Sequence, residues 1–120
     1  MALRATFPFG RENLTMLADF YELTMANGLF QSGHADQIAY FDMFFRRVPD
    51  EGGFALMAGV DQLLDYLESL SFTQEDIDYL REKRLFGEDF LEYLQNFRFS
   101  CDVWAVPEGT PVFPHEPIVT

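Results

Sequence analysis

The sequence predicts an α+β fold, and three features of the 120-residue chain support this prediction. Apolar residues recur at helical spacing in the segments 14–31 and 58–96. The segment 38–47 and the residues after 98 are rich in aromatic and β-branched residues and are bounded or interrupted by proline and glycine. We therefore expect the helices between 58 and 96 to cover one face of a sheet formed by these two segments.

The composition indicates a folded protein and argues against two classes of partner. Hydrophobic residues make up 48% of the chain, which is too many for a disordered segment. The net charge of −12 argues against binding to nucleic acids and to anionic membranes, both of which favour basic surfaces. The single cysteine, Cys101, and the lack of a secretory signal or a membrane-spanning apolar run predict a cytoplasmic location.

The N-terminal third is expected to contain an arm followed by a helix. Residues 1–12 are predicted to form the arm, because Pro8 and Gly10 interrupt regular structure. Asn13 is a candidate N-cap for a helix over 14–31.

The aromatic segment "QIAYFDMFFRRVP" predicts a strand over about 38–47 that stops before Pro49. Side chains alternate between the two faces of a strand. We expect the core face to carry Ala39, Phe41, Met43 and Phe45, and the opposite face to carry Tyr40, Asp42, Phe44 and Arg46.

The rest of the chain predicts three helices and then strands. After the "DEGG" turn, a helix is expected over about 58–69, and Thr73 with Asp76 resembles a capping box that opens a helix ending near Arg84. The stretch "EDFLEYLQNF" predicts a short fourth helix. The Pro-Glu-Gly-Thr turn between two apolar runs predicts a β-hairpin. The final "PHEPIVT" looks like the start of a strand, so we expect a fragment or one domain of a longer protein.

No complete catalytic constellation is evident from the residues alone. The chain has neither a glycine-rich phosphate loop nor an HExxH or GxSxG motif. His34 and His115 lie far apart and have no cysteine partner, so no metal site is expected, and the many carboxylates fall on predicted helix surfaces.

Three features remain, and the first two have both a plain and a functional interpretation. Asp19, Tyr21 and Thr24 in "ADFYELTMANGLF" suit either a packed helix or a helix that faces a ligand. Arg46 and Arg47 are either surface residues near a turn or a clamp for phosphate or carboxylate. The stretch "EGTPVFPHEP" is most simply a proline-protected edge.

Three long stretches together resemble a known family. They are "MLADFYELTMANGLF", "AYFDMFFRRVPDEGGFALMAGVDQLLDYL" and "VWAVPEGTPVFPHEPIV". They are similar to the N-terminal region of nicotinate phosphoribosyltransferase over about residues 12–120, and more distantly to the nicotinamide and quinolinate enzymes. The resemblance implies that residues 13–120 form an N-terminal α/β sandwich-like domain, with an αβ barrel missing after residue 120.

The resemblance also implies an activity for the complete enzyme. Enzymes of this family join nicotinate to phosphoribosyl pyrophosphate and give nicotinate mononucleotide and pyrophosphate in NAD salvage. The reaction is coupled to ATP hydrolysis and uses Mg²⁺, although neither cofactor is expected in this chain alone. The phosphorylated histidine should belong to a barrel segment beyond residue 120, so no catalytic residue is expected here. A homodimer is implied, in which the N-terminal helix of one subunit completes the site of the other.

The resemblance assigns substrate-binding roles to five residues. In the D-x-Y-x-x-T-M motif, Tyr21 would lie over the pyridine ring, with Asp19 beside it and Thr24 one turn further. Asp19 would orient a neighbour or a basic group, because a carboxylate repels that of nicotinate. Arg46 and Arg47 both match the arginine expected to meet phosphate groups across the dimer.

Two other classes of function stay open at this stage. The chain could be a free-standing binding or regulatory module that kept this domain and lost the barrel. It could also be an inactive structural fragment of the same family. The sequence that follows Thr120 would distinguish these alternatives from the enzyme.

Overall fold

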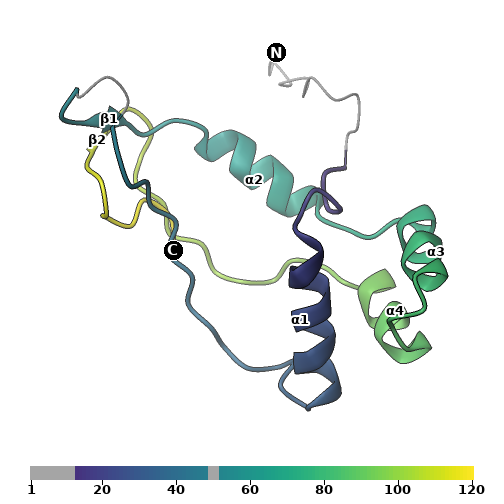
Figure 1. The fold of residues 1–120 in the computed structure, drawn as a ribbon. Coiled ribbons are helices and arrows are strands. Elements are labelled where there is room, and N and C mark those ends of the chain that lie inside the picture. The colour runs from purple at the N-terminus through teal and green to yellow at the C-terminus, as the bar shows by residue number, and fades with distance from the viewer. Residues whose placement is uncertain (1–12, 49–51) are drawn as a thin grey trace. The chain divides into compact units, whose positions relative to one another are not determined.

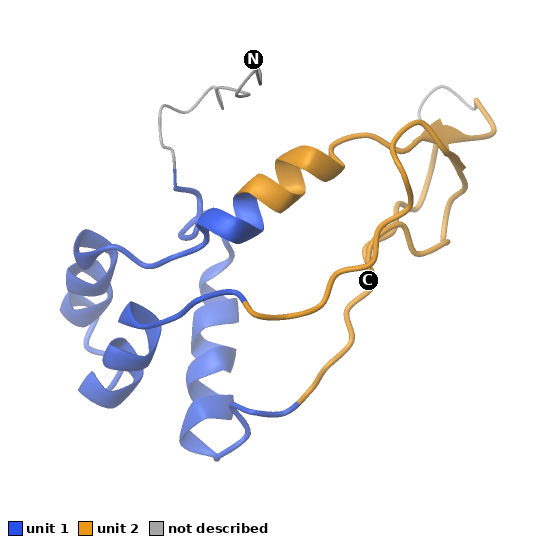
Figure 2. Ribbon diagram, turned by 180° about the vertical axis from the view of Figure 1, so that it is seen from behind, with its two compact units in different colours: residues 1–37, 66–99 blue, residues 38–65, 100–120 orange. Residues whose placement is uncertain are grey.

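The computed structural model describes residues 13–48 and 52–120 and contains four helices and a small two-stranded sheet (Figure 1). The elements follow the order α1 (Phe20–Gln31), β1 (Ala55–Leu56), α2 (Val60–Ser69), α3 (Gln74–Glu82), α4 (Glu88–Gln95) and β2 (Pro111–Val112). The chain divides into two compact units (Figure 2). Unit 1 comprises residues 1–37 and 66–99, and unit 2 comprises residues 38–65 and 100–120. The arm predicted for residues 1–12 lies outside the described residues.

Unit 1 has a hydrophobic core between three helices. Five side chains of α3 and α4 are buried in it: Ile77, Leu80, Phe90, Leu91 and Leu94. Helix α1 packs against this cluster through the partly buried Leu23, Ala26 and Phe30. The ring centroids of Phe30 and Phe90 are 5.5 Å apart, an aromatic contact that joins α1 to α4.

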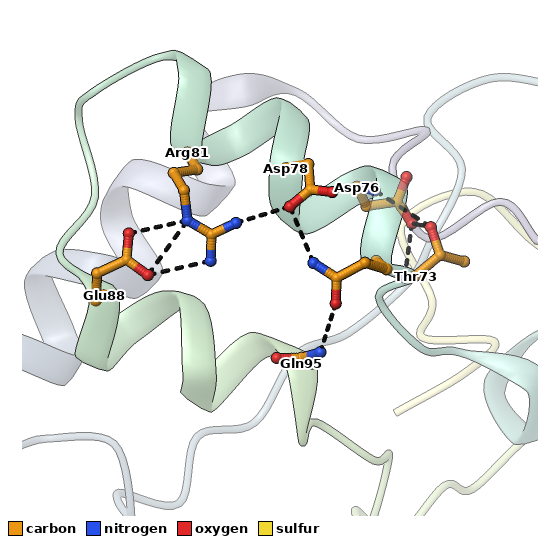
Figure 3. Close-up of polar contacts among 7 residues, drawn as sticks. Thr73, Asp76, Asp78, Arg81, Glu88 and Gln95 are labelled. Carbon is orange, nitrogen blue, oxygen red and sulfur yellow. Dashed lines mark hydrogen bonds and ion pairs between the residues drawn. The ribbon is translucent and has the colours of Figure 1, made fainter.

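Polar contacts on the surface of unit 1 link α3 to α4 (Figure 3). The guanidinium of Arg81 donates to Asp78 at 2.7 Å and to Glu88 at 2.9 Å, so one side chain bridges the two helices. The hydrogen bond to Arg81 lowers the pKa of the Glu88 carboxyl. These groups are well exposed, so water screens the pairs and they add less to stability than the apolar core.

Unit 2 is held together by short antiparallel pairings. β1 pairs with β2 in a register that places Ala55 opposite Val112 and Leu56 opposite Pro111. Val119 forms antiparallel bridges with both Met43 and Ala105, so the C-terminal segment lies between two other segments of this unit.

Glu108 caps helix α2 from a distant part of the sequence. Its carboxylate accepts hydrogen bonds from the backbone N–H groups of Gly59 and Val60, at 2.8 and 2.7 Å. A carboxylate at this end satisfies free N–H groups and interacts favourably with the helix dipole. The neighbouring Gly109 has φ of 78°, a conformation that glycine adopts without strain, and its N–H donates to the carbonyl of Met57.

We predict that Glu108→Ala destabilises unit 2 by about 1 kcal/mol, the usual cost of losing a side-chain cap. The variant leaves the N–H groups of Gly59 and Val60 without their carboxylate partner. Thermal unfolding followed by the fluorescence of Trp104, which belongs to this unit, measures the effect. Glu116→Ala removes another exposed acid of unit 2 and serves as the control. An equal loss in both variants would contradict a capping role.

The predictions for the four helices are largely confirmed, except at the start of the first. The helix expected over 58–69 is α2, the capping box of Thr73 and Asp76 opens α3, and α4 follows Gly87. The predicted N-cap Asn13 was wrong: α1 begins only at Phe20, with Asp19 at its N-cap position.

The predictions for the strands were mostly wrong. The segment 38–47 is not a continuous strand, because only Met43 forms a bridge. Its expected core residue Phe41 is 81% exposed, and Tyr40 on the opposite face is 80% exposed.

The Pro-Glu-Gly-Thr turn is present, but its two arms do not form a hairpin. β2, which follows the turn, pairs with β1, whereas Ala105 before the turn pairs with Val119. The expectation that the helices between 58 and 96 cover a sheet was also wrong for α3 and α4, because their buried side chains form a core cluster with each other and with parts of α1.

Candidate functional site

Helix α1 carries apolar residues on its outer side as well as on the side that faces the core. Leu17, just before the helix, and Tyr21, Met25 and Leu29 recur every fourth residue, and each is at least half exposed. We call these four residues the outer stripe of α1. Residues four apart lie on one face of a helix, so Tyr21, Met25 and Leu29 form a continuous exposed strip on α1, which Leu17 precedes. Such a strip on a helix that already packs on its other side is typical of a surface that meets a ligand or partner.

Tyr21 lies within the outer stripe and is 56% exposed. This agrees with the exposure expected for a ring that faces a ligand. A hydrogen bond to the Glu22 carboxylate and the charge of that group raise the pKa of the Tyr21 phenol, and Asp19 adds a smaller effect in the same direction. The phenol therefore remains neutral at physiological pH, and its ring offers an uncharged aromatic face.

Asp19 and Thr24 lie close to Tyr21 in the sequence, but their contacts differ. The hydroxyl of Thr24 donates to the carbonyl oxygen of Tyr21 at 3.0 Å, so it is engaged with the helix backbone. Asp19 occupies the N-cap position but its side chain makes no capping hydrogen bond. The exposed Asp19 carboxylate therefore does not cap α1.

The structure places Arg46 and Arg47 in unit 2, whereas Asp19, Tyr21 and Thr24 belong to unit 1. Both arginine side chains are exposed, and the chain bends at Arg46. Exposed guanidinium groups are available to phosphate or carboxylate groups. Both arginines are classed as exposed, so burial does not decide between them.

Residues 13–48 and 52–120 offer neither a metal site nor a membrane-spanning helix. No group of three His, Cys, Asp or Glu residues in these ranges is arranged to hold a metal ion. No helix in the same ranges is both long and apolar enough to cross a bilayer. His34 contacts Ser32 through its Nδ1 atom at 2.9 Å, and the ring of His115 lies 6.0 Å from that of Phe44.

Sequence reasoning did not predict the long-range hydrogen bonds that three polar residues make near these elements. Glu108 caps α2, and Asn13 and Thr15 both bond to Ser71, 58 and 56 positions further along the chain. Local patterns carry no sign of such long-range hydrogen bonds.

Comparison with known proteins gives consistent matches. A family model described as the nicotinate phosphoribosyltransferase (NAPRTase) N-terminal domain matches residues 16–120. A nicotinate phosphoribosyltransferase of Mycobacterium tuberculosis is 38% identical over 104 residues, which cover 87% of this chain and 22% of that protein. The Bacillus subtilis nicotinate phosphoribosyltransferase is 36% identical over 113 residues, covering 94% of this chain and 23% of its own length.

The fold agrees with these matches. A crystal structure of human nicotinic acid phosphoribosyltransferase superposes with a TM-score of 0.76 at 34% identity, covering 85% of this chain and 21% of the human chain. The chain thus spans about one fifth of the length of these relatives. On the match over residues 16–120, this chain belongs to the family of nicotinate phosphoribosyltransferase N-terminal domains.

Proposed function

We propose that this chain is the N-terminal part of a nicotinate phosphoribosyltransferase, which joins nicotinate to phosphoribosyl pyrophosphate with ATP hydrolysis and forms nicotinate mononucleotide in NAD salvage. The observation that carries the proposal is the family match over nearly the whole chain, together with 36–38% identity to two bacterial enzymes of that name. In this proposal residues 13–120 are the N-terminal domain, residues 1–12 are an arm, and an αβ barrel lies beyond residue 120.

In this proposal, the cofactors act in the complete enzyme and this chain contributes to substrate binding. Mg²⁺ and ATP would act in the complete enzyme, and Mg²⁺ would supply charge neutralisation at the pyrophosphate. The described residues of this chain contain no metal-holding group of three, so no metal ligand is assigned here. The contribution of this chain would be to bind substrate. We also propose a cytoplasmic homodimer in which α1 of one subunit completes the site of its partner.

Within that dimer, Tyr21 would stack on the pyridine ring of nicotinate. Its exposure and its neutral phenol support this role, because a neutral ring can approach an anionic substrate without charge repulsion. Asp19 would orient a neighbouring or basic group, and Thr24 would shape the helix at Tyr21 through its bond to the Tyr21 carbonyl. Arg46 or Arg47 would meet phosphate groups, for which a guanidinium fork is well suited.

We predict that the 120-residue chain alone forms no nicotinate mononucleotide. The assay supplies nicotinate, phosphoribosyl pyrophosphate, Mg²⁺ and ATP, and follows the product by chromatography. The protein expressed from its complete reading frame is the positive control and should turn over nicotinate in preference to nicotinamide. Turnover by the 120-residue chain would place the active site within this chain. Failure of the complete protein to use nicotinate would overturn the proposed function.

A further inference from the structure

A hydrogen-bonded clasp ties the segment before α1 to the connection between α2 and α3. The backbone N–H of Ser71 donates to the Thr15 hydroxyl at 3.0 Å, and the Asn13 amide donates to the Ser71 carbonyl at 2.7 Å. The Asn13 side-chain oxygen in turn accepts from the N–H of Thr15 at 2.8 Å. Thr15 is buried, with 8% of its surface exposed. We call Asn13, Thr15 and Ser71 the clasp.

The other contacts at the N-terminal end of α1 are only partly buried. None of the helix residues is buried, and Asp19 forms no side-chain cap. Met16 before the helix and Leu23 at the end of its first turn pack against the core, as do Ala26 and Phe30 further along. Gln31 at the far end donates to Asp89 at 3.1 Å.

The first turn of α1 also contacts the rest of unit 1 through one aromatic pair. The ring centroids of Phe20 and Phe86 lie 5.9 Å apart, while Phe20 itself remains 41% exposed. A first turn with no buried residue has low local stability. Thr15 of the clasp, five residues before this turn, is the buried residue nearest to Tyr21 in the described sequence.

We propose that Thr15 is a positioning residue, which through Ser71 holds the first turn of α1 in place and so orients Tyr21 toward its ligand. This inference rests on the proposed function for the identity of the ligand, nicotinate, but the clasp itself does not depend on it. Thr15 contacts no substrate in this proposal. It acts by restricting the backbone that leads into α1, because its buried hydroxyl is the acceptor for the Ser71 N–H.

Thr15→Val tests the clasp because valine has nearly the same shape but cannot accept the hydrogen bond from Ser71. The experiment is hydrogen exchange measured by mass spectrometry on the protein expressed from its complete reading frame. Loss of one buried hydrogen bond should accelerate amide exchange in the first turns of α1 by about five- to tenfold. Exchange in α3 and α4 should stay unchanged, since their buried core does not involve Thr15.

Two further variants serve as controls. Thr15→Ser keeps a hydroxyl and should restore slow exchange in α1. Ser69→Ala removes an exposed hydroxyl that donates to the Tyr66 carbonyl near the same connection, and it should leave α1 unaffected. No acceleration in Thr15→Val, or equal acceleration in α1, α3 and α4, would overturn the clasp as a positioning device.

Steady-state kinetics separate the clasp from the proposed function. If Tyr21 binds nicotinate, Thr15→Val should raise the KM for nicotinate several-fold with little change in kcat, and Thr15→Ser should restore it. If α1 exchanges faster but neither Thr15→Val nor Tyr21→Ala changes this KM, the role of Tyr21 is overturned and the clasp stands. If Tyr21→Ala raises the KM but α1 in Thr15→Val exchanges normally, the clasp is overturned and the role of Tyr21 stands.

Discussion

Replacing Tyr21 by alanine in the complete protein is expected to weaken nicotinate binding by about 1–3 kcal/mol, the scale found for losing an aromatic–base stack. This corresponds to roughly a 5- to 150-fold higher dissociation constant. The thermal stability should change little, because Tyr21 is 56% exposed and the core of unit 1 is formed by other residues. Isothermal titration calorimetry with nicotinate measures the affinity, and differential scanning calorimetry measures the stability.

Two companion variants show which property of Tyr21 matters. Tyr21→Phe keeps the ring and should retain most of the affinity if stacking is the main contribution. Leu29→Ala shortens another member of the outer stripe, two turns further along α1, and should leave nicotinate binding near the wild-type value. If Tyr21→Ala unfolds the protein while the folded fraction binds nicotinate normally, Tyr21 has only a packing role.

Phe90→Ala is expected to lower the free energy of unfolding of unit 1 by about 3–5 kcal/mol, as for other buried aromatic residues cut back to alanine. Phe90 is fully buried, and its ring centroid lies 5.5 Å from that of Phe30 and 5.6 Å from that of Phe86. It therefore joins α4 both to α1 and to the connection that precedes α4. Its removal leaves a cavity where three segments meet.

Urea unfolding followed by circular dichroism at 222 nm measures this loss, since unit 1 contains α1, α3 and α4. Phe113→Ala is the matched control, because Phe113 is 48% exposed and belongs to unit 2. The control should change the stability by no more than about 0.5 kcal/mol, as is usual for surface positions. Similar losses in both variants would show that the aromatic cluster of unit 1 is not its main source of stability.

The contrast between Thr73 and Asn13 shows why one helix start was predicted correctly and another was not. Thr73 caps α3 through Asp76, three residues away, so the whole interaction lies within a few residues of the sequence. Asn13 has equally suitable cap chemistry, but its amide bonds to Ser71, 58 positions away. A local pattern cannot reveal that a polar side chain has a better partner in a distant segment.

The strand predictions were wrong because strand pairing, too, depends on partners in distant segments. The segment 38–47 has strand-like composition, yet pairing depends on the partner that lies beside it, and only Met43 meets one, at Val119. The turn at Glu108 was recognised from its residues. The partners of its two arms, β1 on one side and Val119 on the other, depend on folding.

For the candidate site, the sequence singled out Tyr21 and its motif as candidates, and its resemblance led to the family that the comparisons confirm. The substrate-binding roles of Asp19, Tyr21, Thr24, Arg46 and Arg47 stay predictions. Helical periodicity and capping are local properties, so α2, α3 and α4 could be located from residues close together in the chain. Only the tertiary structure decided which face of α1 packs against the core and which distant backbone N–H groups donate to Thr15 and Glu108. Both depend on contacts between residues some fifty or more positions apart, which no local pattern contains.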